Sequence, residues 1–239
     1  MRLLKRLVVV SAAFVSSVTG AMAGGDLRGS IKDDYNPAPV SRAWYLRADV
    51  GYAWQNANDL WVEHPTLATS KVDNTWTVGG GIGRYFGLGL RGDVTYEYRG
   101  KTSFDAISTN CCSTSTHFDM KSQVVMANLY YDFRPGAHIN PYIGAGIGAA
   151  YNETSGGSYP GNTCGCTPYD GKSQWNMAWA LMAGASMNID SRTKLDMGYR
   201  YINLGEVVTG PNHWDGKPGP SSKDLDAHEL RIGVRYDLR

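Results

Sequence analysis

The stretch HELRIGVRYDLR, residues 228–239, alternates between apolar and polar side chains almost without a break. One face holds Leu230, Ile232, Val234, Tyr236 and Leu238, and the other holds Arg231, Gly233, Arg235, Asp237 and Arg239. Successive side chains of a β-strand point to opposite faces, so this period predicts a strand. A soluble sheet rarely buries a stripe with three arginines, whereas a barrel wall with lipid outside and a polar lumen inside requires both faces. We therefore interpret the stretch as a strand of a transmembrane β-barrel.

Seven earlier segments show the same period. They span about residues 44–54, 75–86, 89–99, 123–133, 141–149, 175–189 and 194–201. In the third, Val94 and Tyr96 alternate with Asp93, Thr95 and Glu97. Eight is an even number, as the closed barrels of bacterial outer membranes have. The predicted fold is all-β: an eight-stranded antiparallel transmembrane β-barrel.

The connections between these segments alternate in length. Short turns are expected near Gly87, near Pro135-Gly136 and near Asp190-Ser191. The other four connections hold roughly 20 polar residues each, and short periplasmic turns opposite long extracellular loops are typical of outer-membrane barrels. We expect the turns and both chain ends on the periplasmic side.

Aromatic residues collect at both ends of the predicted strands, where amphipathic rings favour the membrane interface. The turn ends hold Trp44, Phe86, Phe133, Tyr142 and Tyr236, and the loop ends hold Tyr52, Trp54, Trp76, Tyr98, Tyr151, Trp175 and Tyr201. The strand middles hold mainly aliphatic residues and glycine. This distribution supports the membrane interpretation independently of the alternation.

The first 23 residues have the composition of a secretory signal peptide. A basic segment with Arg2, Lys5 and Arg6 precedes an apolar stretch at 7–18, and Ala21-Met22-Ala23 forms a small-x-small cleavage site. The apolar core holds about a dozen residues, fewer than the roughly 20 that a membrane-spanning helix needs. We predict cleavage between Ala23 and Gly24, an extended periplasmic segment at 24–43 and a barrel domain at 44–239.

The charge balance argues against a nucleic-acid partner. The chain has 23 Lys and Arg against 22 Asp and Glu, and removal of the signal peptide lowers the formal net charge from +1 to −2. A nucleic-acid footprint requires a clear basic excess. We expect outer-membrane lipid, lipopolysaccharide and the barrel assembly machinery as partners, with the loops open to a further partner outside the cell.

Three segments carry a resemblance to a known family. They are GDLRGS at 25–30, WYLRADVGY at 44–52 and LDMGYRY at 195–201. In these the chain resembles small eight-stranded outer-membrane proteins, of the type of the transmembrane domain of outer-membrane protein A, and single-domain surface proteins of alphaproteobacteria. The resemblance implies a porin-like surface protein of the cell outer membrane. The chain departs from this pattern at Arg239, where such barrels usually end in an aromatic residue.

Twelve charged residues fall on the inward face of the predicted strands. They are Arg47, Asp49, Arg91, Asp93, Glu97, Arg99, Asp132, Asp196, Arg200, Arg231, Arg235 and Asp237. An eight-stranded barrel has an interior just wide enough for side chains to fill it. Because buried charges must be paired, this balanced set predicts a salt-bridged, filled lumen. A narrow, gated water path through the same network is the alternative.

Four cysteines fall in two of the long loops, at Cys111, Cys112, Cys164 and Cys166. Exported proteins meet an oxidising compartment, so disulfides are expected. A bridge between adjacent residues is geometrically awkward, which favours bridges between the two loops. A metal site built from these cysteines and the isolated His117 has a weak signature.

The sequence predicts no enzyme active site and no cofactor. No Ser/His/carboxylate set converges at a recognisable spacing, and Gly144-x-Gly146-x-x-Ala149 lacks the strand–turn–helix context of a nucleotide-binding loop. The function expected is that of a structural surface protein with exposed loops for cell-surface interaction. A small-solute porin is the alternative, and a lipid-modifying outer-membrane enzyme is a remote one.

Overall fold

A computed structural model describes residues 44–61, 67–108, 115–160, 166–213, 216, 219 and 221–238. The regular elements among these residues are β-strands, and the described part of the chain contains no helix long and apolar enough to cross a membrane. The predicted signal peptide, its cleavage site and the segment at 24–43 lie outside the described residues.

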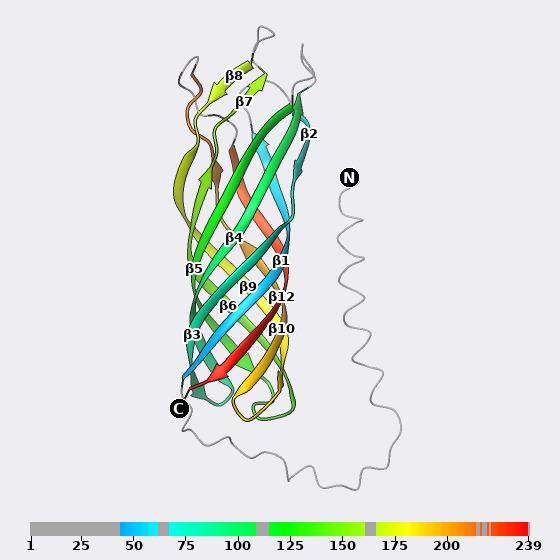
Figure 1. The fold of residues 1–239 in the computed structure, drawn as a ribbon, viewed down its shortest axis with the longest axis vertical. Helices are drawn as coiled ribbons and strands as arrows, with labels where there is room; N and C mark the ends of the chain where they lie inside the picture. Colours follow the sequence, from blue (N-terminus) through cyan, green and yellow to red (C-terminus); the bar gives the residue numbers. More distant parts are fainter. Residues whose placement is uncertain are drawn as a thin grey trace, which may run out of the picture. The chain divides into compact units, whose positions relative to one another are not determined.

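Eight long strands form a closed antiparallel ring (Figure 1). In ring order they are β1 (Trp44–Trp61), β3 (Thr75–Gly87), β4 (Leu90–Ser108), β5 (Ser115–Asp132), β6 (Ile139–Thr154), β9 (Lys172–Asn188), β10 (Thr193–Asn203) and β12 (Ser221–Asp237). The ring closes between β1 and β12, which pair from Tyr45↔Asp237 to Trp61↔Ser221. The predicted eight-stranded barrel is therefore confirmed, with β12 as its closing strand.

Four short strands lie beside this ring. β2 (Leu67–Val72) pairs with β4, and β11 (Val207–Val208) pairs with β12. β7 (Gly157–Pro160) and β8 (Cys166–Tyr169) form a separate two-stranded sheet. In Figure 1 this sheet lies at the end of the barrel opposite the tight turns. We call the two ends of the barrel the turn end, with the β3–β4, β5–β6 and β9–β10 connections, and the loop end, with β2, β7, β8 and β11.

The tight connection between β3 and β4 requires an unusual backbone. Gly87, Leu88 and Gly89 all have positive φ, at 88°, 54° and 80°. Glycine reaches this region without the steric penalty of a side chain, which explains two of the three residues. Leu88 is 92 % exposed, so its side chain leaves the sheet at the turn.

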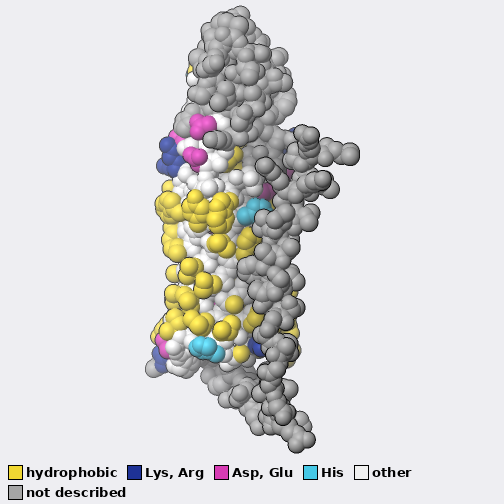
Figure 2. Space-filling view, turned by 90° about the vertical axis from the view of Figure 1, so that its right-hand side faces the viewer, with side chains coloured by type: hydrophobic (Ala, Val, Ile, Leu, Met, Phe, Trp, Pro, Cys, Tyr) yellow, Lys and Arg dark blue, Asp and Glu magenta, His cyan; other side chains and the backbone are white. Residues whose placement is uncertain are grey.

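The alternation in the sequence separates a lipid-facing wall from the lumen as predicted. On β1, for example, Leu46 and Val50 are 46 % and 59 % exposed, whereas Arg47 and Asp49 are buried. Figure 2 shows hydrophobic side chains spread over the wall between charged groups near its two ends. One aromatic expectation was wrong. Tyr142 lies inside the lumen, because it has the inward parity of β6, opposite to that of Ile143.

The strands continue much farther toward the loop end than the sequence prediction allowed. β4 reaches Ser108 and β5 begins at Ser115, so much of the expected loop between them is β-sheet. In this extension the amphipathic pattern inverts: the stacked rings of Phe104 and Phe118 are buried inside, and Lys121 is exposed outside. A β-bulge between Arg99 and Thr102 shifts the parity of β4 at the change. The extension has the pattern of a water-exposed sheet above a membrane-embedded one.

Candidate functional site

The charged lumen is the most distinctive chemical feature of the barrel. All twelve inward charges expected from the sequence lie inside it, and Glu229 and Lys194 join them. The set is balanced in the described part of the chain. The cations are Arg47, Arg91, Arg99, Lys194, Arg200, Arg231 and Arg235, and the carboxylates are Asp49, Asp93, Glu97, Asp132, Asp196, Glu229 and Asp237.

Two glutamates and three arginines form the centre of this network. Arg200 lies 2.6 Å from Glu97 and 2.5 Å from Glu229. Arg99 contacts the same two carboxylates, at 3.1 Å for Glu97, and Arg231 lies 3.2 Å from Glu97. Because these side chains come from β4, β10 and β12, their ion pairs cross the lumen and join strands that are not all neighbours in the ring.

Arg47 extends the network toward the turn end. Its guanidinium lies 2.6 Å from Asp49 and 2.8 Å from Asp93, and it donates to the hydroxyl of Tyr130 at 2.8 Å. Arg231 contacts Asp49 at 3.6 Å, which links this group to the central one. The chain of contacts therefore runs through the lumen without a break.

Near the turn end, cations lie against tyrosine rings. Arg91 pairs with Asp132 at 3.1 Å and lies 4.0 Å from the ring centroid of Tyr130. Arg235 lies over the rings of Tyr45 and Tyr85, at 5.3 and 5.7 Å. Cation–π contacts of this kind stabilise a desolvated guanidinium while filling space. Two more ion pairs complete this layer: Arg235 with Asp196 at 3.1 Å, and Lys194 with Asp237 at 2.5 Å.

Because these ion pairs are buried, the stability of each charged side chain depends on the presence of its partners. The idealised cost of moving an ion from water to the interior is offset only when its partners are close and well oriented. Removing one member leaves an uncompensated buried charge, which typically costs about 3–5 kcal/mol. The network therefore ties the barrel wall together through its centre.

A small cavity lies inside this network. One cavity of about 10 Å³ lies among Arg47, Asp49, Tyr142, Asp196 and Arg231. A volume of this size holds about one water molecule. Tyr142 fills the space next to it, because Gly184 and Gly198 carry no Cβ; one added there would lie 2.7 and 2.6 Å from the Tyr142 hydroxyl.

An apolar layer covers the network on its loop side. It includes Phe104, Phe118, Met120, Ile202 and Leu225, all buried. The layer also includes Leu204 and Val207, which belong to the segment 204–209 after β10. We call this segment the strap.

The strap is held by side chains that point into the lumen. Two side-chain amides and one hydroxyl donate to its carbonyl oxygens: Asn152 to Leu204 at 3.1 Å, Thr154 to Val208 at 3.1 Å, and Asn176 to Glu206 at 2.6 Å. Gly205 has a φ of 74°, which allows the chain to turn inward after β10. The strap thus connects β10 to residues of β6 and β9 across the loop end.

A small platform lies at the loop end. It consists of β7, β8 with the adjoining residues 170–172, and residues 210–213, and it joins the third and fourth long connections. The amide of Gly210 donates to the carbonyl of Asp170 at 2.8 Å, and that of His213 to the carbonyl of Pro168 at 2.9 Å. Tyr169 is buried with the apolar layer, and this burial raises the pKa of its hydroxyl. The platform is therefore anchored to the barrel interior.

Of the four cysteines expected to form disulfides, only Cys166 lies among the described residues. Cys111, Cys112 and Cys164 lie outside the described residues, and Cys166 begins β8 opposite Pro160. The cross-loop disulfides remain a prediction. Within the described ranges no group of three or more His, Cys, Asp and Glu has the geometry to hold a metal ion.

Sequence reasoning missed two of the lumen charges, although the signal was present. Glu229 has the same parity as Arg231 and Arg235, so the alternation of the final strand already places it inside. Lys194 precedes the first expected apolar residue of its strand and has the inward parity of Asp196. The strap had no such signal, because no period marks it.

Comparison with known proteins agrees with the fold. Residues 13–237 match the family model described as outer membrane protein beta-barrel domain. Among solved structures, Neisserial surface protein A is similar with a TM-score of 0.50 and 20 % identity, covering 82 % of this chain and 97 % of that one. The outer membrane protein OprG from Pseudomonas aeruginosa is similar with a TM-score of 0.53 and 12 % identity, covering 82 % and 95 %.

Sequence relatives extend over the same region. An uncharacterised protein of Brucella melitensis is 30 % identical, with 98 % of each chain covered. The outer membrane protein PagN of Salmonella typhimurium is 32 % identical over 63 % of this chain and 66 % of its own. A Rickettsia bellii protein named as a candidate adhesin is 24 % identical over 98 % of this chain and all of its own. This chain belongs to the outer membrane protein beta-barrel domain family and is a protein of the cell outer membrane.

Proposed function

We propose that this protein is a non-enzymatic surface protein whose loop end contacts a partner outside the cell. The observation that supports this most is the filled lumen. Balanced charges, tyrosine rings and an apolar layer occupy the interior, and the cavity among them has room for about one water molecule. A barrel without a continuous aqueous path is suited to presenting a surface and poorly suited to passing solutes.

The platform supplies a surface of this kind. Backbone hydrogen bonds join its two connections, and an ion pair of 3.0 Å between His213 and Asp170 adds a side-chain link. Binding residues often lie on loops that a rigid scaffold positions, and a pre-ordered surface loses less conformational entropy on binding. The relatives named above support the proposal: one is PagN, and another carries an adhesin name.

An attachment assay tests the proposal. The full chain is expressed in a non-adherent bacterial strain, and attached bacteria are counted on cultured epithelial cells. We expect more attachment than with empty vector, and we expect replacement of Asp170, Lys172 and His213 by Ser to reduce it. All three side chains are exposed at the loop end.

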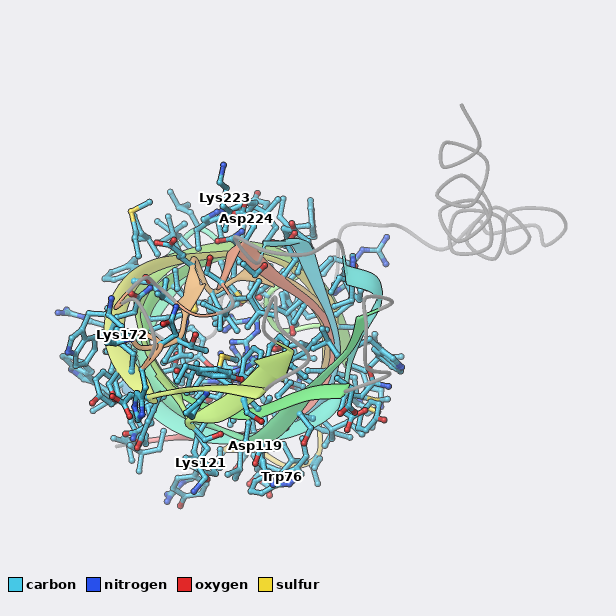
Figure 3. The ribbon with its side chains drawn as sticks, turned by 90° about the horizontal axis from the view of Figure 1, so that it is seen from above. Trp76, Asp119, Lys121, Lys172, Lys223 and Asp224 are labelled. Atoms are coloured by element: carbon cyan, nitrogen blue, oxygen red, sulfur yellow. The ribbon has the colours of Figure 1, made fainter. Side chains whose placement is uncertain are left out.

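The matched control replaces two other exposed residues of the loop end, Lys223 and Asp224, by Ser (Figure 3). These side chains lie on β12, outside the platform, and the control is expected to attach like the wild type. Wild-type cells that attach no better than vector cells would contradict the proposal. Equal losses of attachment in both variants would show that the platform is not the contact surface.

A further inference from the structure

The turn end of the barrel carries a cation, Arg84, on its lipid-facing wall, and this cation has no ion-pair partner among the described residues. Arg84 has the outward parity of β3 and is exposed. Its guanidinium lies 5.5 Å from the ring centroid of Trp44, the residue opposite it in the β1–β3 register. Neither an ion pair nor a hydrogen bond joins the Arg84 side chain to the described part of the chain.

The position of Arg84 places it at the edge of the membrane. Its outward neighbours on the same strand are Ile82 and Phe86, 45 % and 58 % exposed, and Trp44 is 47 % exposed. Aromatic residues mark the interface between hydrocarbon and headgroups, and long basic side chains extend to the same level. The guanidinium is therefore expected at the level of the lipid phosphates.

Among the described residues, the outside of the turn end carries more positive than negative charge. Beside Arg84, the exposed or half-buried charged side chains on the outside of the turn end are Arg134, Arg192 and Asp190, within the described residues. The only carboxylate of this group accepts hydrogen bonds from the amides of Arg192 and Thr193 at 2.7 and 2.8 Å. With three arginines and one carboxylate, which is already hydrogen-bonded to the backbone, this surface attracts anionic lipid more strongly than zwitterionic lipid.

We propose that Arg84, with Trp44 beside it, binds the headgroup phosphate of an anionic phospholipid in the leaflet at the turn end. The guanidinium donates to the phosphate oxygens in the forked geometry that arginine offers to phosphate. The Trp44 ring holds the guanidinium in place and lies against the upper part of the lipid chains. Nothing in this proposal depends on the function proposed for the loop end.

Native mass spectrometry of the full-length barrel tests the binding. Phosphatidylglycerol is titrated against the wild type, Arg84→Gln and Arg84→Lys, and phosphatidylethanolamine with the same chains is the second arm. A basic residue near an anionic membrane surface contributes about 1 kcal/mol, which corresponds to about fivefold in affinity. We expect the first phosphatidylglycerol to bind Arg84→Gln about fivefold more weakly, with Arg84→Lys between the two.

The matched control is Lys223→Gln, which removes an exposed cation from the loop end. It is expected to bind phosphatidylglycerol like the wild type. Brominated phosphatidylglycerol provides a local readout in vesicles: it should quench Trp44 emission, measured as the difference between the wild type and Trp44→Phe, more than brominated phosphatidylethanolamine does. Equal affinity of Arg84→Gln and the wild type, or no preference of the wild type for the anionic lipid, would overturn the proposal.

Discussion

At the scale of single residues, the lumen depends on a few side chains that each serve several partners. Glu229 is fully buried and contacts both Arg99 and Arg200, while Glu97 contacts these two and Arg231. A carboxylate shared by two arginines cannot be removed without leaving a buried cation short of a partner. The stability of the barrel should therefore be sensitive to individual lumen residues and tolerant of changes on the outer rim.

Replacement of Glu229 by Gln tests this sensitivity. The variant keeps the shape of the side chain and removes its charge, so we expect the free energy of unfolding to fall by about 3 kcal/mol or more. The measurement is urea unfolding in lipid vesicles, followed by tryptophan fluorescence. Asp224→Asn, an exposed change on the same strand, should stay within about 0.5 kcal/mol of the wild type. Equal stability of the two variants would show that the central pairs contribute little.

The turn between β9 and β10 allows a prediction about pH. Hydrogen bonds from the backbone amides of Arg192 and Thr193 hold the pKa of Asp190 below its ordinary value of 3.8. A carboxyl whose pKa is lowered on folding stabilises the fold at pH values above 3.8, and this contribution is lost as the pH falls through the folded pKa. A carboxyl-carbon NMR titration should give a midpoint below 3.8. A midpoint at or above that value would contradict the hydrogen-bonded turn.

At the scale of elements, the membrane part of each strand was predictable and the loop end was not. Period-two alternation identifies the strands and the side of the wall on which each residue lies. The extension of β4 keeps alternating, but its bulge shifts the parity and its apolar side turns inward. Above the membrane an alternating segment can have either sense, so the sequence pattern alone does not tell a sheet from a polar loop there.

The strap shows why long-range contacts escape sequence reasoning. Its path is set by Asn152, Thr154 and Asn176, which lie on other strands and are far away in sequence. Nothing in residues 204–209 by themselves indicates that Leu204 and Val207 are buried in the barrel. By contrast, Glu229 could have been assigned to the lumen from its parity alone.

Replacement of Asn152 by Ala tests the role of the strap. The variant removes the donor to Leu204 and the acceptor of the Ser122 hydroxyl, and we expect local opening to become about fivefold or more frequent, as a loss of about 1 kcal/mol implies. Limited proteolysis from the loop side should cleave near 204–209 faster, while the barrel itself stays resistant. Glu153→Ala, an exposed change at the next position, is the control. Unchanged cleavage in Asn152→Ala would mean that other contacts hold the strap.

At the scale of the whole molecule, the barrel combines two arrangements of apolar and polar surface. In the wall segment the lumen is charged and the outside apolar, and at the loop end the interior is apolar and the outside polar. The charged lumen and the apolar layer both fill the interior, so two different kinds of packing close the same barrel. This packing predicts that no continuous water path runs through the described part of the barrel.

Reconstitution of the full-length protein in planar lipid bilayers tests whether the lumen conducts. We expect a silent bilayer across the usual range of voltages, under conditions in which a general porin inserted as a positive control gives regular steps. Folding of the protein is verified separately by the different migration of unboiled and boiled samples on SDS gels. Frequent, stable channels of uniform conductance from the inserted protein would contradict the filled lumen.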